Sequence, residues 1–435
     1  MSLASLAMPV AVAGLGLHGW SMATAAVVSA ACALVGCFLV VRRMSLLGDA
    51  IAHAVLPGIA VGVLAGGSLG GPLVLVGAVA AAGVTVWLTR ALHEAVGLAE
   101  DAGAGVVFTS LFALGVVIVT LFATRIDLDP QCVLFGILEL TAFDLVSLGP
   151  LVVPRALVTA VIVLALVAGT LLGTWRLQVF TAFDPAGARA GGVPVAAVTA
   201  LLMGTTAVAT VAAFEAVGAV LVVAMLVVPA ATAELLTHRM PRVVALAVIL
   251  AMAAACLGWA AAWWLDTSAA GMMAVVLGGF YALAVLVAPG DGLLARAAAR
   301  LSLAWRVARE DWLARIWRAG EQGSGAGGVP RPRPRSVFER VVAAWLEWTG
   351  VVDSRAGTVR LSPAAVREAE TVVRSHRLWE AWLGRHAELP LDHLHPPAEW
   401  VEHHLGAAMR ERIEAEMAAG AADPHGREIP PEAAR

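Results

Sequence analysis

The sequence predicts an all-α polytopic membrane protein with about nine transmembrane helices, followed by a small, mostly helical cytoplasmic domain that carries one β-wing. Two observations lead to this fold class. Of the 435 residues, 60% are hydrophobic and only 14% are charged, whereas soluble domains have about 25% charged residues. The composition then changes abruptly after Pro289. The net charge of -3 provides no overall basic field for nucleic acid, so the lipid bilayer is the partner that the composition implies.

Nine windows contain the roughly 20 mostly apolar residues that a helix needs to cross a hydrocarbon core about 30 Å thick. They are residues 20–41, 50–67, 72–89, 103–124, 145–175, 193–213, 216–236, 243–265 and 268–288. The fifth window is unusually long and is interrupted by Pro154 and Arg155. We therefore expect residues 1–19 to be an N-terminal extracytoplasmic segment and residues 20–290 to form the transmembrane domain.

Arginines in the short loops predict the orientation, because cytoplasmic loops carry an excess of Lys and Arg. With nine spans the arginine-rich loops share one side: Arg42, Arg43, Arg90, Arg176, Arg189, Arg239 and Arg242. The opposite loops carry Arg125 and are otherwise mainly neutral or acidic. This asymmetry predicts a multi-pass protein of the plasma membrane, with its N-terminus outside and its C-terminal domain in the cytoplasm.

The region after the last span is rich in Arg, Glu and His and contains no spanning window. Within residues 291–335, the stretch 295–319 predicts a basic amphipathic helix, and 321–335 predicts a Gly/Pro/Arg linker, which has no means of burying a core. Residues 336–418 return to helical periodicity, interrupted at 350–361 by a segment typical of two short strands, and the domain is expected to extend over residues 336–435. This pattern predicts a small helical domain with one wing.

Asp49 and His53 stand four residues apart near the start of the second span, so their side chains share one face of a helix. A carboxylate and an imidazole together suit a transient site for a divalent transition metal. The alternative is that Asp49 caps the helix and His53 bonds a neighbouring helix. Because ionisable groups within a membrane are costly, a function in the transport path is favoured.

Four stretches resemble, in order, the permease subunits of ABC importers for zinc and manganese. They are RRMSLLGDAIAHAVLPG from Arg42, EDAGAGVVFTSLFALGV from Glu100, LDPQCVLFG from Leu128 and FEAVGAVLVVAMLVVPAATAELLT from Phe214. The resemblance implies a helical permease of a bacterial inner membrane that transports a divalent metal such as Mn, Zn or Fe. It also implies three partners, namely an ABC ATPase subunit, an extracytoplasmic metal-binding protein, and either a second copy or a second related permease.

The chain has no G-x-x-x-x-G-K-[ST] phosphate loop, so we expect it to bind no nucleotide and not to be an enzyme. The stretch TAFDPAGARAGGVP from Thr181 resembles the family's coupling segment, with a plain connecting loop as the alternative. The residues expected to contact the ATPase are Thr181, Phe183, Asp184, Gly191 and Pro194. Glu215, beside a span, is a further candidate for the transport path. Asp127, Asp129 and Glu139 in a predicted outer loop are candidates for an acidic funnel that attracts cations and docks the binding protein, with solvated loop charges as the alternative.

Seven of the 11 histidines lie in the last 60 residues. Several of them share a helical face with carboxylates, a donor set that suits Mn, Fe(II) or Zn better than Cu(I), although a solvated charged face has the same spacing. SHRLWEAWL from Ser375, HLHPPAEWVEHHL from His393 and DPHGREIP from Asp423 resemble the metal-binding and dimerisation region of diphtheria-toxin-repressor-like regulators. The ligands that this resemblance implies are His376, Glu380, His395, Glu399, Glu402 and His403, with Asp311 at a further ligand position.

The resemblance departs from the regulators upstream, where the winged-helix region is degenerate. In REDWLARIW from Arg309, Ala314 replaces an expected carboxylate, and the Gly/Pro/Arg linker stands where a helix-turn-helix would be completed. Specific DNA binding needs an intact helix presented to the major groove, so DNA is not an expected partner. Glu399 occupies the position of a Cys in iron-type regulators, which favours manganese as a regulatory ligand.

The leading hypothesis is therefore an ATP-driven importer permease with a cytoplasmic metal-sensing tail. A membrane-tethered, metal-dependent transcription regulator is one alternative, and it predicts salt-dependent DNA binding by the tail. An ATP-independent secondary metal carrier is the other.

Overall fold

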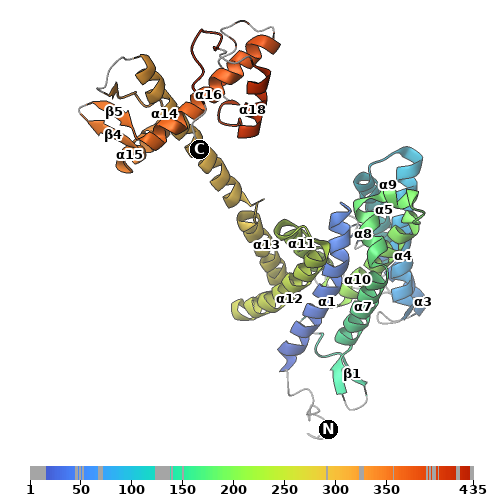
Figure 1. Cartoon of the computed structure of the whole chain (residues 1–435). Helices are drawn as coiled ribbons and strands as arrows, with labels where there is room; N and C mark the ends of the chain where they lie inside the picture. The colour runs from blue at the N-terminus through green and yellow to red at the C-terminus, as the bar shows by residue number, and fades with distance from the viewer. Residues whose placement is uncertain are drawn as a thin grey trace. The chain divides into compact units, whose positions relative to one another are not determined.

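The computed structural model describes residues 16–44, 48, 50, 53–66, 72–122, 138, 141–148, 151–290, 292–322, 328–355, 357–387, 390, 393, 398, 399, 401–417 and 422–431. The chain divides into two compact units, Met1–Ala295 and Arg296–Arg435, called here the membrane unit and the tail unit. Each unit is considered by itself (Figure 1).

The membrane unit is built from long apolar helices. Within the described residues, seven helices are long and apolar enough to cross a membrane. They are α1 (Gly16–Val41), α4 (Pro72–Val96), α5 (Glu100–Leu121), α7 (Arg155–Gly173), α10 (Val195–Val217), α12 (Met240–Leu265) and α13 (Ala269–Val287). Two shorter apolar helices, α3 (Leu56–Gly66) and α11 (Ala219–Leu236), fall in the remaining two predicted windows. Each of the nine windows thus contains a helix, and seven of these helices have full spanning length.

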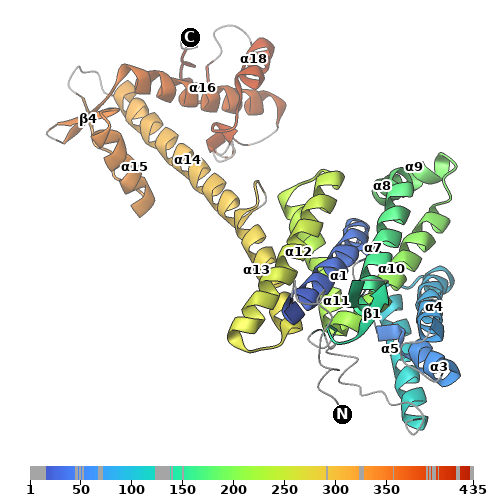
Figure 2. The same ribbon diagram turned by 90° about the horizontal axis from the view of Figure 1, so that it is seen from below.

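Helix α1 forms the centre of the membrane unit and packs against α7, α10, α11 and α12, while α3, α4 and α5 pack together (Figures 1 and 2). Small residues allow the closest approaches. A Cβ at Gly36 of α1 would collide with the backbone of Leu226 in α11, and Gly58 and Gly77 face each other in the same way between α3 and α4. Such contacts are typical of membrane helices, which associate through close packing because lipid supplies no hydrophobic driving force.

The fifth predicted window is only partly helical, so the expectation of a span over 145–175 is wrong at its start. Residues Leu145–Leu148 (β1) and Leu151–Pro154 (β2) form an antiparallel hairpin. The N–H group of Arg155 donates to the carbonyl of Asp144 at 2.8 Å, and α7 begins at Arg155. Pro154 has no N–H for an i→i−4 bond and would clash inside a helix, which explains why the helix begins after it.

A glycine separates the next two spans. Gly218 has φ of 79° and ψ of 164°, a backbone conformation that is essentially restricted to glycine and that ends α10 at Val217 before α11 begins at Ala219. Glu215 therefore lies within the last turn of α10.

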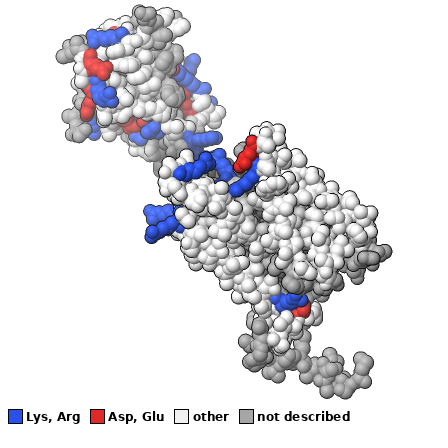
Figure 3. Space-filling view, turned by 90° about the vertical axis from the view of Figure 1, so that its right-hand side faces the viewer, with Lys and Arg blue, Asp and Glu red and all other residues white. Residues whose placement is uncertain are grey.

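The surface of the membrane unit matches a bilayer environment. On the face drawn in Figure 3, charged residues lie at two opposite ends and leave an uncharged zone between them. Large apolar side chains such as Trp264, Val275 and Leu172 are exposed on the helices of this unit. Exposed apolar surface of this extent suits lipid rather than water.

The tail unit combines helices with a small sheet. Its elements are α14 (Leu293–Gln322, beginning just before the unit boundary), β3 (Val329–Pro330), α15 (Val337–Trp348), β4 (Val352–Arg355), β5 (Thr358–Leu361), α16 (Pro363–His386) and α18 (Ala407–Glu416). The sheet has the order β3-β5-β4, and β4 and β5 form the expected wing. The expectation that residues 321–335 form only a linker is wrong, because α14 extends to Gln322 and Val329 pairs with Val359 of β5.

Candidate functional site

Arg42, just after α1, is the centre of a polar cluster in the membrane unit. Its Nη1 donates to Thr199 Oγ1 at 3.0 Å, and its Nη2 donates to Gln178 Oε1 at 2.8 Å and Thr181 Oγ1 at 2.6 Å. Gln178 and Thr181 lie on α8 (Trp175–Phe183), whereas Thr199 lies on α10, and all three acceptors are buried. Arg42 therefore ties α8 and α10 to the end of α1 through neutral acceptors.

Arg90 of α4 lies at the same end of the unit, because its Nη1 donates to the carbonyl of Ala196 in α10 at 3.5 Å. Arg42 and Arg90 come from two of the loops predicted to share the arginine-rich side. Both contact the part of the chain from α8 to the start of α10.

A short helix, α9 (Pro185–Ala190), follows α8 within the predicted coupling segment. Asp184 is its N-cap, and the Asp184 carboxylate accepts a hydrogen bond from the N–H of Gly187 at 2.8 Å. Gly191 is the C-cap, and Pro194 occupies the N-cap position of α10. Phe183, Pro185 and Ala190 are exposed, whereas Thr181 is buried beneath Arg42. The segment is therefore a short, capped helix whose exposed residues are mostly small, apart from Phe183 and Arg189.

The predicted transport-path residues are described only in part. The ring of His53 lies 6.0 Å from that of Phe108 and 5.9 Å from that of Phe112, both on α5. Asp49 lies outside the described residues, as do Asp127, Asp129 and Glu139. Glu215 is placed by its backbone in α10. The structure thus sets His53 against an aromatic face of a neighbouring helix.

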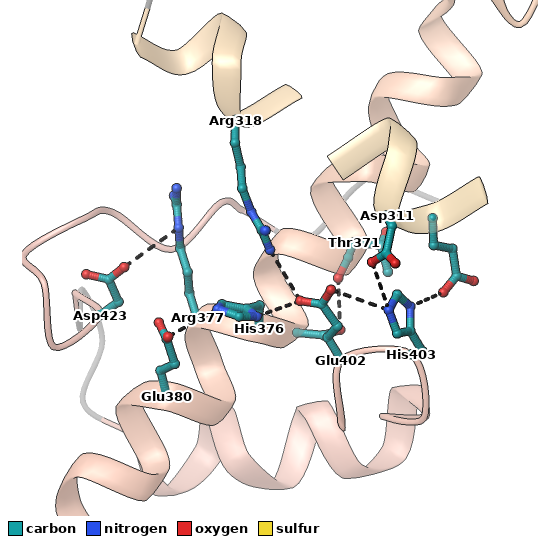
Figure 4. Close-up of polar contacts among 11 residues, drawn as sticks. Asp311, Arg318, Thr371, His376, Arg377, Glu380, Glu402, His403 and Asp423 are labelled. Carbon is teal, nitrogen blue, oxygen red and sulfur yellow. Dashed lines mark hydrogen bonds and ion pairs between the residues drawn. The ribbon is translucent and has the colours of Figure 1, made fainter. Parts of the chain in front are cut away.

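Two histidines and several carboxylates form the polar cluster of the tail unit (Figure 4). His403 Nδ1 lies 2.7 Å from Glu310 Oε2, and His403 Nε2 lies 3.2 Å from Asp311 Oδ1. Glu402 Oε1 is 3.5 Å from the same Nε2 atom. Three carboxylates therefore surround one imidazole, two of them supplied by α14 and one by the residue before His403.

His376 of α16 extends this arrangement through Glu402. Its Nδ1 lies 2.6 Å from Glu402 Oε2, and its Nε2 lies 3.1 Å from Glu380 Oε1. The side chains of His376, Glu380 and Glu402 are all buried. Arg318 donates to Glu402 at 3.2 Å, so Glu402 joins the two histidines and a cation from α14.

The carboxylates determine the charge of both imidazoles. Burial alone would lower the pKa of His403, but hydrogen bonds with Asp311 and Glu310 and the charge of Glu402 raise that pKa to about 9. Burial also opposes protonation of His376, while hydrogen bonds with Glu380 and Glu402 raise its pKa above the usual value. The cluster is therefore electrostatically suited to hold positive charge.

The geometry also suits a metal ion. Asp311, Glu402 and His403 each offer one ligand atom, and these atoms all lie within 4.8 Å of one another. Two carboxylates and one imidazole are ligands that divalent transition metals accept. The residues present thus fit a divalent cation, with His376 and Glu380 next to the site.

Comparisons with known proteins separate the same two regions. Residues 17–288 match the model of the ABC 3 transport family. The chain belongs to the ABC 3 transport family. Residues 362–431 match the model of the iron dependent repressor metal binding and dimerisation domain. This ABC 3 chain is accordingly the membrane permease of an ABC transporter and not its ATPase subunit, and its partners are an ATPase and a binding protein.

Individual relatives agree with this assignment. The chain is 38% identical to the manganese transport system membrane protein MntD of Bacillus subtilis, over 65% of this chain and 96% of that protein. It is 37% identical to the zinc transport system membrane protein TroD of Treponema pallidum, over 62% and 74%. The solved structure of PsaBC from Streptococcus pneumoniae in complex with Fab matches with a TM-score of 0.55 and 26% identity, over 64% of this chain and 95% of that one.

Of the ligands predicted for the tail, the structure brings together Asp311, His376, Glu380, Glu402 and His403 (Figure 4). Glu399 is exposed and is not part of the three-residue group, and His395 lies outside the described residues. Sequence reasoning missed Glu310, which contacts His403, and Arg318, which pairs with Glu402. Glu310 stands directly before Asp311 in α14, and Arg318 follows Glu310 by about two helical turns. This spacing places Glu310 and Arg318 near the same side of the helix as the predicted ligand and was the signal that could have indicated them.

Proposed function

We propose that this chain is the permease subunit of an ATP-driven importer of divalent transition-metal ions, with manganese as the leading cargo and zinc or iron(II) as alternatives. One observation supports this above all: residues 17–288 match a permease family whose similar members include manganese, zinc and chelated iron transport proteins. The permease would work as a homodimer or with a second related permease in a bacterial plasma membrane. Its N-terminus would be outside and its tail unit in the cytoplasm.

His53, Asp49 and Glu215 are the proposed contacts of the metal in the transport path. An imidazole and two carboxylates would provide a transient binding set for a borderline divalent ion. Position supports His53, which lies three residues before α3 and has its ring against Phe108 and Phe112 of α5. The test is manganese uptake by proteoliposomes that contain the whole transporter. His53→Ala should abolish uptake, and His238→Ala, an exposed residue between α11 and α12, is the matched control.

Helix α9 is the proposed coupling element. It is short and capped at both ends, and it lies next to α8, which Arg42 holds against α1 and α10. Movement of α9 by the ATPase would therefore reach the core of the membrane unit through α8. Thr181 is the buried contact in this linkage, while Phe183, Asp184, Gly191 and Pro194 shape the surface around α9.

The tail cluster is the proposed regulatory metal site. Asp311, Glu402 and His403 would hold the ion, with His376 and Glu380 beside it, and the oxygen-rich donor set favours manganese. A bound divalent ion would supply fixed positive charge that draws α14 and α16 together with the segment around His403. Inhibition of transport would follow if the tail with metal prefers one state of the transporter.

Two measurements test this regulatory site separately from transport. Manganese should raise the melting temperature of the full-length protein, because a ligand that binds only the folded state stabilises it by about 2.7 kcal/mol at 100 times its Kd. His403→Ala should remove that rise, whereas His404→Ala, an exposed neighbour, should retain it. In proteoliposomes, deletion of residues 291–435 should relieve inhibition by internal manganese. Equal inhibition with and without the tail would exclude the sensor role.

A further inference from the structure

Helix α15 of the tail unit precedes the β4–β5 wing and has two apolar faces. One face is buried, with Val342, Ala343 and Leu346 packed in the core of the unit. The opposite face is exposed and consists of Val337, Val341, Ala344, Trp345 and Trp348, called here the α15 stripe. These five positions recur at intervals of three and four residues, so they form one continuous band along the helix.

The α15 stripe is strongly exposed for its residue types. Trp348 is 82% exposed, Val337 71% and Val341 54%. A helix that contacts DNA would instead present polar and basic side chains to base edges and phosphates. An exposed apolar band on an otherwise well-packed unit indicates a partner that is itself apolar.

Positive charge borders the α15 stripe. Arg340 lies on the exposed face of α15, and Arg333 and Arg335 precede the helix, all three with exposed side chains. The nearby acidic residues are partly neutralised, because Glu339 pairs with Arg315, and Glu347 with Arg331 at 2.9 Å. Aromatic residues with arginines at their border are typical of protein surfaces that lie in the headgroup region of a bilayer.

The chain itself keeps the α15 stripe within reach of a bilayer. Trp345 packs against Trp305 of α14 with ring centroids 5.5 Å apart, and α13 ends at Val287. With up to about 3.5 Å per extended residue and about 1.5 Å per helical residue, Trp305 lies within about 40 Å of the end of that span. A tether of this length gives a weak surface contact a high effective concentration.

We propose that the α15 stripe binds the surface of the bilayer in which the chain is anchored. Trp345, Trp348 and the two valines enter the interfacial layer, and the bordering arginines contact anionic headgroups. Each basic side chain near an anionic surface contributes attraction, while the aromatic rings prefer the interface to either water or hydrocarbon. This surface depends on neither the metal site nor the identity of the cargo.

Site-directed spin labelling of the full-length protein in liposomes tests this contact. In a background that retains transport with Cys32, Cys37, Cys132 and Cys256 changed to Ala, Ala344→Cys places the label on the α15 stripe. Ala408→Cys on α18 is the matched control, because Ala408 is also an exposed alanine of the tail unit. Collisions of each label with oxygen, which partitions into lipid, are compared with collisions with a water-soluble nickel chelate.

At Ala344→Cys we expect oxygen collisions to rise and nickel collisions to fall several-fold relative to Ala408→Cys, in vesicles of phosphatidylcholine with phosphatidylglycerol. The difference should shrink in pure phosphatidylcholine and disappear when Trp345→Ser and Trp348→Ser are added. Equal nickel accessibility at both positions in anionic vesicles would overturn the proposal. So would a label shielded from both reagents, or one that stays immobile in detergent, since either result means that protein covers the α15 stripe.

Discussion

The two units bury different kinds of polar residue. In the described part of the membrane unit, every buried polar side chain is a neutral Ser, Thr or Gln. In the described part of the tail unit, the buried polar set includes Glu339, Arg374, His376, Arg377, Glu380, Glu402 and Asp423. Among the described residues, charge is therefore absent from the buried set of the membrane unit and concentrated in that of the tail unit.

The difference follows from what each environment supplies. Most hydroxyls of the membrane unit donate to the carbonyl four residues earlier in their own helix, as Thr206 does to Leu202, and need no partner elsewhere. Charges in the tail unit need partners from other elements, because an isolated buried charge is very unfavourable. Polar links between helices of the membrane unit thus come from Arg42 and from neutral groups such as Gln178, whereas the tail unit joins separate segments through ion pairs that a cation can alter.

The largest test of this contrast is Arg377→Ala in α16. Arg377 is buried, donates to Glu321 at 2.5 Å and to the carbonyl of Glu428 at 2.6 Å, and lies 3.9 Å from Asp423. Its removal takes a charged donor from Glu321 and from the Glu428 carbonyl, and a nearby positive charge from the buried Asp423. Because a hydrogen bond to a charged group contributes about 1.5–3 kcal/mol, we expect the tail unit to lose about 3 kcal/mol of unfolding free energy. This loss of unfolding free energy is measured by hydrogen exchange of the backbone amides of residues 422–431 in the full-length protein. The exposed Arg385→Ala on the same helix should change little, and equal effects of the two substitutions would refute the contrast.

Arg42→Gln is the corresponding test in the membrane unit. It removes the one charged donor that joins α1 to α8 and α10 in the described cluster, and a hydrogen bond to a charged group contributes about 1.5–3 kcal/mol. We expect lower thermal stability and loss of metal uptake at unchanged ATPase binding. The exposed neighbour Arg43→Gln serves as control. Full uptake by Arg42→Gln would mean that this linkage does not carry coupling.

The sequence predicted the membrane unit well where hydrophobicity decides the structure. In the part of the chain that the structure describes, each of the nine apolar windows contains a helix and seven of these helices are long enough to span a membrane, because in lipid a spanning backbone must satisfy its hydrogen bonds internally. It failed at residues 145–154, where an apolar run of Leu and Val suits a strand as well as a helix. The sequence also did not predict that Arg42 contacts Gln178 and Thr199, because these residues are more than 130 positions away from it in the chain.

In the tail unit, the motif resemblance located most of the polar cluster, but local pattern alone could not. Glu380 follows His376 by one helical turn, whereas Asp311 reaches His403 across 92 residues. The sequence did not predict the strand at Val329, because two residues in a Gly/Pro/Arg segment are too few to show the alternation of apolar and polar residues that identifies a strand. Its pairing with β5 depends on tertiary contact.

Glu321→Gln provides a smaller, pH-dependent test of the tail unit. The hydrogen bond from Arg377 lowers the pKa of Glu321 below its usual value, against the opposing effect of burial. A depressed carboxyl pKa contributes stability above the unfolded pKa, and that stability is lost as the pH falls through the folded value. Because the Glu321 side chain is 37% exposed, we expect less than about 1 kcal/mol. The difference in melting temperature between the wild type and Glu321→Gln should be present at neutral pH and vanish in acid; a difference that persists would assign the effect to packing.

Thr206→Val should have the smallest effect on stability. It tests the neutral buried groups of the membrane unit. Thr206 is fully buried in α10, and its Oγ1 donates to the Leu202 carbonyl at 2.8 Å. Valine keeps the shape of the side chain, and the carbonyl keeps its helical partner, so only a local bond is lost. Side-chain hydrogen bonds in membrane helices average about 0.6 kcal/mol, and we expect no more than that in unfolding from detergent, with uptake unchanged. A loss comparable to that of Arg42→Gln would mean that a hydroxyl bonded within its own helix contributes as much as the Arg42 cluster that joins three helices, and that the two units differ in charge but not in how their interiors are held.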